Sequence, residues 1–230
     1  MRKFLGWLSA GVALMGCNST SIVRAGFQVP AVQEMAFVSP ITTIAVVRYN
    51  NPGVIDKEAT IASESLLHEA LVRRRAQLRL RNEVTVPDSL LTQARREVYR
   101  AVAAIEEHWQ LASGADLPAL DYLLSRQDQR YALILAASGF TRIPKLHELL
   151  NRPYMARIGY LVVDKYNRGN DAGRAKSKLF LFIYDTHQKA IVYYAHTPPL
   201  NDFEPLDAAS LEKQLSKLLK RDFSQPNARN

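Results

Sequence analysis

Two runs of aromatic and β-branched residues late in the chain most constrain its fold. Residues 179–184 read Leu-Phe-Leu-Phe-Ile-Tyr and residues 190–194 read Ala-Ile-Val-Tyr-Tyr, and five polar residues, 185–189, join them. Runs of this composition favour strands, and so short a polar link favours antiparallel pairing of the two. The pattern therefore predicts a sheet that contains a β-hairpin.

Three further runs predict strands. Residues 41–49 are rich in β-branched side chains and stop at the turn cluster Asn-Asn-Pro-Gly of residues 50–53. Residues 131–137 form a continuous apolar run that is short for a helix, which predicts a strand covered on both faces. Residues 158–163 resemble that run, although Gly159 weakens the strand pattern there.

Helical spacing separates these strands. It predicts helices over residues 57–75, from residue 88 to about 109, over 117–126, and from an Asp207 N-cap to the end of the apolar leucine series. One strand, several helices, a group of strands and a last helix imply an α/β (α+β) fold. We expect a mixed, mostly antiparallel sheet of about five strands, covered by helices in a single domain.

The N-terminus has the layout of an export signal. Arg2 and Lys3 precede an almost wholly apolar or small stretch over residues 4–16. Thirteen helical residues span about 20 Å, which is less than the roughly 30 Å hydrocarbon core of a bilayer. A cleaved signal therefore explains the segment better than a transmembrane helix.

The end of this segment, Leu14-Met15-Gly16-Cys17, resembles the lipobox of bacterial lipoproteins. The resemblance implies that Cys17 is lipidated and becomes the mature N-terminus, with the lipid bilayer as its partner. Asn18 in place of aspartate implies the outer membrane, with the domain facing the periplasm. The alternative is an ordinary secretory signal that is cut elsewhere.

The predicted domain organisation follows from these patterns. Residues 1–16 are the signal peptide, and residues 17–40, with several Ser, Thr and Pro, are predicted to be a lipidated N-terminus and flexible tether. Residues 41–222 form the single domain, and residues 223–230 a disordered tail.

Composition narrows the function classes. The formal charge is +8, and Arg2 and Lys3 carry two of these charges, which leaves +6 for the mature chain. We expect no nucleic-acid partner outside the cytoplasm, so the surplus favours anionic envelope ligands or solubility. Because Cys17 is the only cysteine, an anchored domain has no disulfide and no catalytic thiol.

Catalytic and metal motifs are missing from the sequence. No Gly-x-Ser-x-Gly elbow occurs, and Ser138 lacks the first glycine of that turn. The five histidines are scattered, and we expect neither a metal nor another cofactor. Asp164 and Asp185 each follow an apolar strand, where they are either turn residues or ligand-binding carboxylates. His187 and His196 flank one strand at a spacing that places them on opposite faces.

Two basic segments remain. Residues 165–178 are predicted to be a solvated connection between strands; alternatively, Arg168, Arg174 and Lys176 bind an anionic ligand. The arginines of residues 73–81 offset the partial charge at a helix C-terminus, or they form a docking surface for an acidic partner.

The succession of Ile44-Ala45-Val46-Val47, helices, residues 131–135 and the turn at 185–189 resembles the small α/β periplasmic domains of outer-membrane accessory lipoproteins. These include the curli-secretion lipoprotein and the activators of penicillin-binding proteins. Against that pattern, residues 73–109 are predicted to be a long helical insertion. The resemblance implies a non-enzymatic binding or assembly factor with an envelope protein or anionic polymer as partner. The alternatives are an envelope hydrolase or transferase with a dispersed site, and a binder of an anionic envelope ligand.

Overall fold

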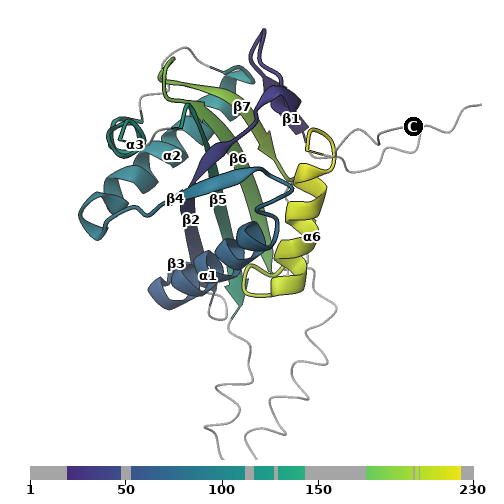
Figure 1. Ribbon diagram of the computed structural model, residues 1–230. Coiled ribbons are helices and arrows are strands. Elements are labelled where there is room, and N and C mark those ends of the chain that lie inside the picture. The colour runs from purple at the N-terminus through teal and green to yellow at the C-terminus, as the bar shows by residue number, and fades with distance from the viewer. Residues whose placement is uncertain are drawn as a thin grey trace, which may run out of the picture.

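The computed structural model describes residues 20–47, 53–111, 117–126, 129–142, 175–198, 200–201 and 203–223. In this part of the chain eight strands form one mixed sheet, with the order β1-β7-β6-β5-β2-β3; β4 also pairs with β2, and β8 with β6. Helices cover both faces of the sheet (Figure 1). The predicted single-domain, mostly antiparallel α+β fold is confirmed, with more strands than the five expected.

The strands are β1 (Thr20–Val23), β2 (Met35–Val47), β3 (Val54–Ile55), β4 (Leu80–Val84), β5 (Tyr131–Arg142), β6 (Lys176–Asp185), β7 (Ala190–His196) and β8 (Leu200–Asn201). The helices are the short 3-10 turn η1 (Val29–Ala31), α1 (Lys57–Arg73), α2 (Asp88–His108), α3 (Pro118–Leu124) and α6 (Ala208–Leu219). Strand β2 pairs in parallel with β4 and β5, and the other pairings are antiparallel.

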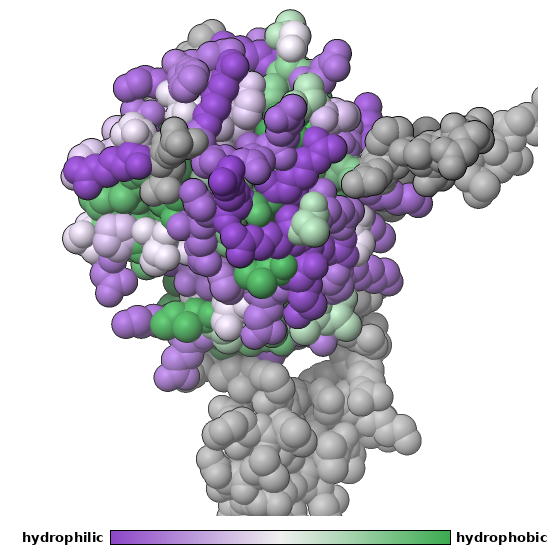
Figure 2. All heavy atoms as spheres, viewed as in Figure 1, coloured by the Kyte–Doolittle hydropathy of each residue, from purple (hydrophilic) through white to green (hydrophobic). Residues whose placement is uncertain are grey.

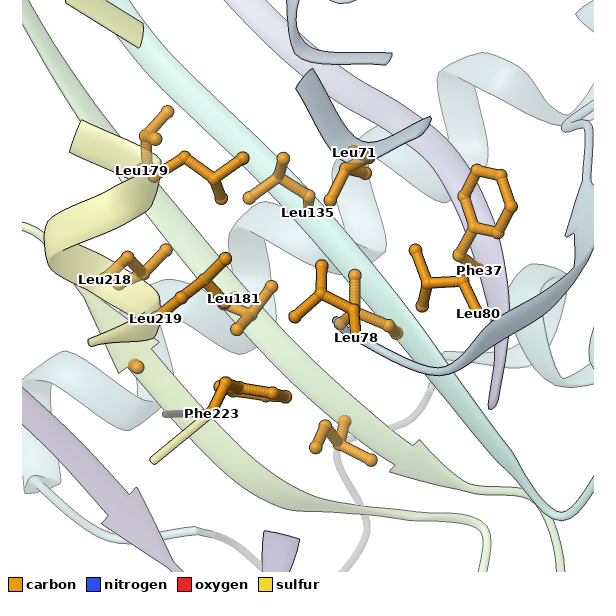
Figure 3. Close-up of a cluster of buried hydrophobic side chains, with 14 of the residues drawn as sticks. Phe37, Leu71, Leu78, Leu80, Leu135, Leu179, Leu181, Leu218, Leu219 and Phe223 are labelled. Atoms are coloured by element: carbon orange, nitrogen blue, oxygen red, sulfur yellow. The ribbon is translucent and has the colours of Figure 1, made fainter. Parts of the chain in front are cut away.

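Apolar side chains gather inside, and the face drawn in Figure 2 is mostly hydrophilic, with small separate hydrophobic patches. One core lies between the sheet and helices α1 and α6, where Leu71, Leu135, Leu181 and Leu219 come together (Figure 3). A second core lies between the opposite face and helices α2 and α3. Neighbouring residues of β5 alternate between the two cores, which confirms a strand buried on both faces.

The predicted tether over residues 17–40 is wrong from residue 20 onward, and so is the predicted start of the domain at residue 41. Strand β1 pairs with β7, with Thr20 opposite His196, and β2 begins at Met35. Strand β1 is a short, half-exposed edge strand, so it carries little hydrophobic pattern. Pro40 lies within β2 where the register with β5 shifts, and there its missing N–H costs no regular ladder bond.

Two other boundaries differ from the prediction. Strand β4 interrupts the helical insertion that was expected over residues 73–109. Backbone hydrogen bonds hold β4 against β2, and such bonds require no apolar periodicity in the side chains. The sequence pattern therefore did not reveal this strand. Phe223, predicted as the first residue of a disordered tail, is buried in the core beside Tyr193. The burial of Phe223 ties the end of α6 to the sheet.

The remaining elements agree with the sequence pattern. The β6–β7 hairpin is antiparallel and closes through residues 186–189. Asp207 caps α6, because its carboxylate accepts a 2.8 Å hydrogen bond from the Ser210 N–H. The strand predicted over residues 158–163 lies outside the described residues. None of the described helices is both long and apolar enough to cross a membrane.

Candidate functional site

A polar and aromatic cluster lies where the C-terminal end of α2 meets β6 and β7. It consists of Glu106 and Trp109 at the end of α2, Lys178 on β6, and Tyr194 and His196 on β7; we call it the α2-end cluster. The spacing of α2 turns its apolar side towards the sheet, and alternation along β6 and β7 turns these side chains towards α2. The packing of α2 across the sheet thus brings together residues from three elements that are distant in the sequence.

Glu106 is the centre of the cluster. Its Oε1 accepts a 2.9 Å hydrogen bond from the Tyr194 hydroxyl and a hydrogen bond from the Lys178 ammonium. The His196 Nδ1 lies 3.8 Å from the same oxygen. The Lys178 side chain is 19% exposed and that of Glu106 is 31% exposed, so this ion pair is partly shielded from water.

These contacts set the ionisation of the cluster. Burial alone would raise the pKa of Glu106, but hydrogen bonds from Lys178 and Tyr194 lower it below its ordinary value of 4.5. Burial, with the Lys178 charge, lowers the pKa of His196 below 6.5. Burial and the Glu106 charge raise the pKa of Tyr194 far above 10.0. At neutral pH the cluster therefore holds one fixed ion pair, a neutral imidazole and a neutral phenol.

The imidazole of His196 is held by aromatic contacts. It stacks on Tyr194 with ring centroids 5.8 Å apart, and the Trp109 indole meets it edge-on at 5.4 Å. Its Nδ1 lies 3.1 Å from the carbonyl oxygen of Thr197, and its buried Nε2 has no hydrogen-bond partner among the described residues. The neutral tautomer with the proton on Nδ1 fits this arrangement.

Trp109 forms the exposed part of the cluster. It ends α2 in the left-handed conformation, with φ at 52°, and its N–H donates a 2.7 Å hydrogen bond to the Ile105 carbonyl. The residue is 44% exposed although one edge of its ring contacts His196. The cluster therefore presents a fixed aromatic surface to the outside.

The ionisable groups of the cluster are already engaged with one another. Its carboxylate is already hydrogen-bonded, and its phenol stays protonated, so neither is poised as a general base. The one hydroxyl of the cluster, the Tyr194 phenol, is paired with Glu106, whose lowered pKa makes this carboxylate a weak base. Among the described residues, no group of three or more His, Cys, Asp or Glu could hold a metal ion.

The residues predicted to bind an anion are not brought together by the described structure. Lys176 is half-buried as the first residue of β6, whereas Arg168 and Arg174 lie outside the described residues. Cys17, the predicted lipidation site, and Asp164 also lie outside them. The anion-binding hypothesis therefore stays a prediction.

Asp185 has the role of a turn residue. It is 1% exposed, and its Oδ1 accepts hydrogen bonds from the N–H groups of His187, at 2.9 Å, and Gln188, at 3.1 Å. Its Oδ2 pairs with the Arg130 guanidinium at 2.9 Å. Burial would raise the pKa of Asp185, but these hydrogen bonds hold it below its ordinary value of 3.8. The carboxylate is occupied in closing the β6–β7 hairpin.

The other singled-out side chains do not converge with Asp185. His187 is exposed in the hairpin turn, whereas His196 ends β7. Ser138 lies within β5, opposite Lys178 of β6, and not on the tight strand-to-helix turn of an activated serine. His147 lies outside the described residues.

The arginines of residues 73–81 fasten the C-terminal end of α1 to its neighbours. Arg74 donates a 2.9 Å hydrogen bond from Nε to Glu212 of α6 and also pairs with it through Nη2. Arg79 donates to the Pro30 carbonyl at 2.9 Å, and Arg81 pairs with Glu34. An open hollow of about 520 Å³ lies among these side chains. Much of the arginine charge is thus used within the fold.

Sequence patterns missed the α2-end cluster. The only local signal was Lys178, a charged residue directly before a buried apolar run on β6. Its partner Glu106 lies on the side of α2 that the periodicity assigns to solvent, 72 residues earlier in the chain. Only the packing of α2 across the sheet makes the two side chains neighbours.

No family model matches the chain, and no curated protein matches it. Among solved structures, the PelC dodecamer from Paraburkholderia phytofirmans shares 15% identity, with a TM-score of 0.36. That match covers 87% of this chain and 93% of the other. A single-substitution variant of the same PelC matches at 16% identity and a TM-score of 0.36, covering 87% and 97%.

Proposed function

We propose that this protein is a lipid-anchored factor of the bacterial cell envelope, on the outer membrane and facing the periplasm. It acts by binding or assembly rather than by catalysis. The observation that carries this proposal is the apolar segment that ends in Leu14-Met15-Gly16-Cys17. A lipidated Cys17 adds roughly 0.8 kcal/mol of membrane affinity for each buried methylene of its acyl chains, so that several chains anchor the protein stably.

The non-enzymatic part of the proposal is supported by the state of the candidate groups. Asp185, the described carboxylate on which a dispersed hydrolase site would rely, is buried and engaged by two backbone N–H groups and Arg130. Glu106 is engaged by Lys178 and Tyr194. Carboxylates whose oxygens already accept hydrogen bonds in this way support the structure or a binding surface. They are not free to act as a general acid or base.

Replacement of the cysteine tests the anchor. We expect the Cys17→Ala protein to lose incorporation of labelled palmitate and to leave the membrane fraction, whereas wild type stays there. Asn18→Ala is the matched control, because it changes the neighbouring residue and keeps the thiol; it should still take up the label. A wild-type protein that takes up no acyl label, together with a Cys17→Ala protein that stays in the membrane, contradicts the proposal.

In vivo crosslinking followed by affinity capture of the acylated protein tests the binding role. We expect one envelope protein or polymer to be enriched over the same capture from Cys17→Ala cells, because the anchor places the domain beside its partner. Equal recovery from both strains would contradict a role that depends on the membrane.

A further inference from the structure

The point at which the chain enters the fold lies beside the exposed tryptophan. Thr20, the first residue of β1, pairs with His196 of β7, and the His196 ring contacts Trp109. Ile22 of β1 packs on the α2 side of the sheet, and Thr20, two residues earlier, lies on the same side. Thr20, His196 and Trp109 thus share one surface, which we call the anchor-side surface.

The length of chain between Cys17 and this surface is short. Three Cα–Cα steps lead from Cys17 to Thr20, and a fully extended chain spans at most about 3.6 Å per step, or about 11 Å in total. The headgroup layer on each side of a bilayer is about 5 to 8 Å thick. A lipidated Cys17 therefore leaves the anchor-side surface no room to stand far from the headgroups.

We propose that the anchor-side surface rests on the bilayer and that Trp109 inserts its indole ring among the lipid headgroups. The proposal rests on the lipidation of Cys17 described above. Trp109 is then a second membrane contact beside the lipidated Cys17. The acyl chains alone would restrict only the distance of the domain from the membrane. The two contacts together also fix its orientation.

The chemistry of Trp109 suits this position. Tryptophan is enriched at membrane interfaces because its ring is apolar while its N–H needs a polar partner. The ring is 44% exposed, and the left-handed turn and the contact with His196 hold it in place, so insertion orders it little further. The Glu106 carboxylate of the same cluster is balanced by Lys178, so this ion pair adds no net charge next to anionic headgroups.

Fluorescence tests the proposal directly. The chain has two tryptophans, Trp7 and Trp109, and Trp7 leaves with the signal peptide, so emission of the mature protein reports on Trp109 alone. The probe is the acylated mature protein in vesicles of phosphatidylethanolamine and phosphatidylglycerol. The reference in solution is the unacylated chain from Asn18 onward, which also lacks Trp7. Relative to it, we expect emission at shorter wavelength, a drop of more than half in acrylamide quenching, and new quenching by brominated lipids.

A matched variant moves the fluorophore to a distant surface. Tyr122 on α3 is 51% exposed and lies near Leu90, at the opposite end of α2 from Trp109. In the acylated double variant Trp109→Phe with Tyr122→Trp, emission should stay accessible to acrylamide and unaffected by brominated lipids. Equal lipid quenching at both positions would contradict a fixed orientation.

The outcomes separate this inference from the proposed function. Acylated protein whose Trp109 stays as accessible as in solution overturns the inference and leaves the lipid anchor intact. Shielding from acrylamide without quenching by brominated lipids means that a second copy or another protein covers Trp109, which also overturns the inference. Wild type without acyl label overturns the proposed function, and this inference with it.

Discussion

At Gly139, strands β5 and β6 approach so closely that no side chain fits. A Cβ atom at this position would lie 2.9 Å from the Cα of Ser177 and still closer to the Lys176 carbonyl oxygen. Both are backbone atoms, so no side-chain rotation relieves the clash. The glycine is therefore needed where β5 meets the first residues of β6 at such close range.

Gly139→Ala should lower the free energy of unfolding by about 1–3 kcal/mol, because the added methyl group forces the backbones apart. Urea unfolding followed by circular dichroism measures this. Ser138→Ala, one residue earlier on the same strand, is the control and should change stability by less than about 0.5 kcal/mol. Equal stability of the two variants would show that β6 moves aside at little cost.

His196 makes the fold sensitive to acid. Its folded-state pKa lies below its ordinary value of 6.5, so in the interval between the two the unfolded chain binds more protons. Stability is then complete above about pH 6.5 and falls as the pH drops towards the folded pKa. Glu106, whose pKa is also lowered, adds a further loss below its ordinary value of 4.5.

The urea midpoint of wild type should therefore fall between about pH 7.5 and pH 5, and that of His196→Gln should fall less, because the replacement does not titrate. His187→Gln is the matched control, since His187 is exposed in the turn of the same hairpin. This variant should follow the wild-type profile. A His196→Gln profile that coincides with wild type would exclude His196 as the source of the acid sensitivity.

At the scale of elements, helix α1 completes one edge of strand β2. Strand β4 pairs with β2 up to Val38, and β3 pairs with it from Ala45. Between them, the Thr42 N–H donates to Glu64 at 3.1 Å, and the Ile44 N–H donates to the Thr60 hydroxyl at 3.2 Å. Side chains of α1 thus satisfy backbone groups that a neighbouring strand would otherwise pair.

Thr60→Val keeps the shape of the side chain and removes its hydroxyl, which leaves the Ile44 N–H buried without that acceptor. We expect a loss of about 1–3 kcal/mol in the free energy of unfolding. Hydrogen exchange of the Ile44 amide should also accelerate. Thr92→Val makes the same chemical change on the exposed side of α2 and should leave both quantities nearly unchanged. If Ile44 exchange does not change, the hydroxyl is not its essential partner.

At the scale of the whole molecule, the proposed lipidation of Cys17 makes the short connection to β1 decide how the domain meets a membrane. A long tether over residues 17–40 would have let the domain tumble freely. Because β1 starts at Thr20, the first strand leaves three residues for that connection. The orientation of the domain is then a property of the sheet edge at which the chain enters.

Lengthening the connection tests this. An insertion of about 20 Gly and Ser residues between Asn18 and Thr20 extends the average reach to about 25 Å. Acylation should persist, and Trp109 emission in vesicles should return towards its value in solution. The same insertion after Phe223 is the control and should change neither. Continued lipid quenching with the long connection would mean that Trp109 binds the bilayer without help from the short reach.

The sequence by itself determined the elements that bury an apolar face. Helices α1, α2, α3 and α6, strands β2 and β5 and the β6–β7 hairpin follow from periodicity, because burial against a partner demands a spacing of 3.6 or 2 residues. The mixed, helix-covered sheet followed from their order. The lipobox prediction likewise rests on residues 14–17 alone.

Tertiary structure decided the rest. Strands β1 and β4 are held at the sheet by backbone hydrogen bonds, and such bonds leave little pattern in the side chains. The α2-end cluster joins Glu106 to Tyr194 across 88 residues. No local spacing encodes a contact of that range, because it depends on where a packed helix ends over a sheet. For the same reason, the surface shared by Thr20, His196 and Trp109 emerged only once β1 was placed against β7.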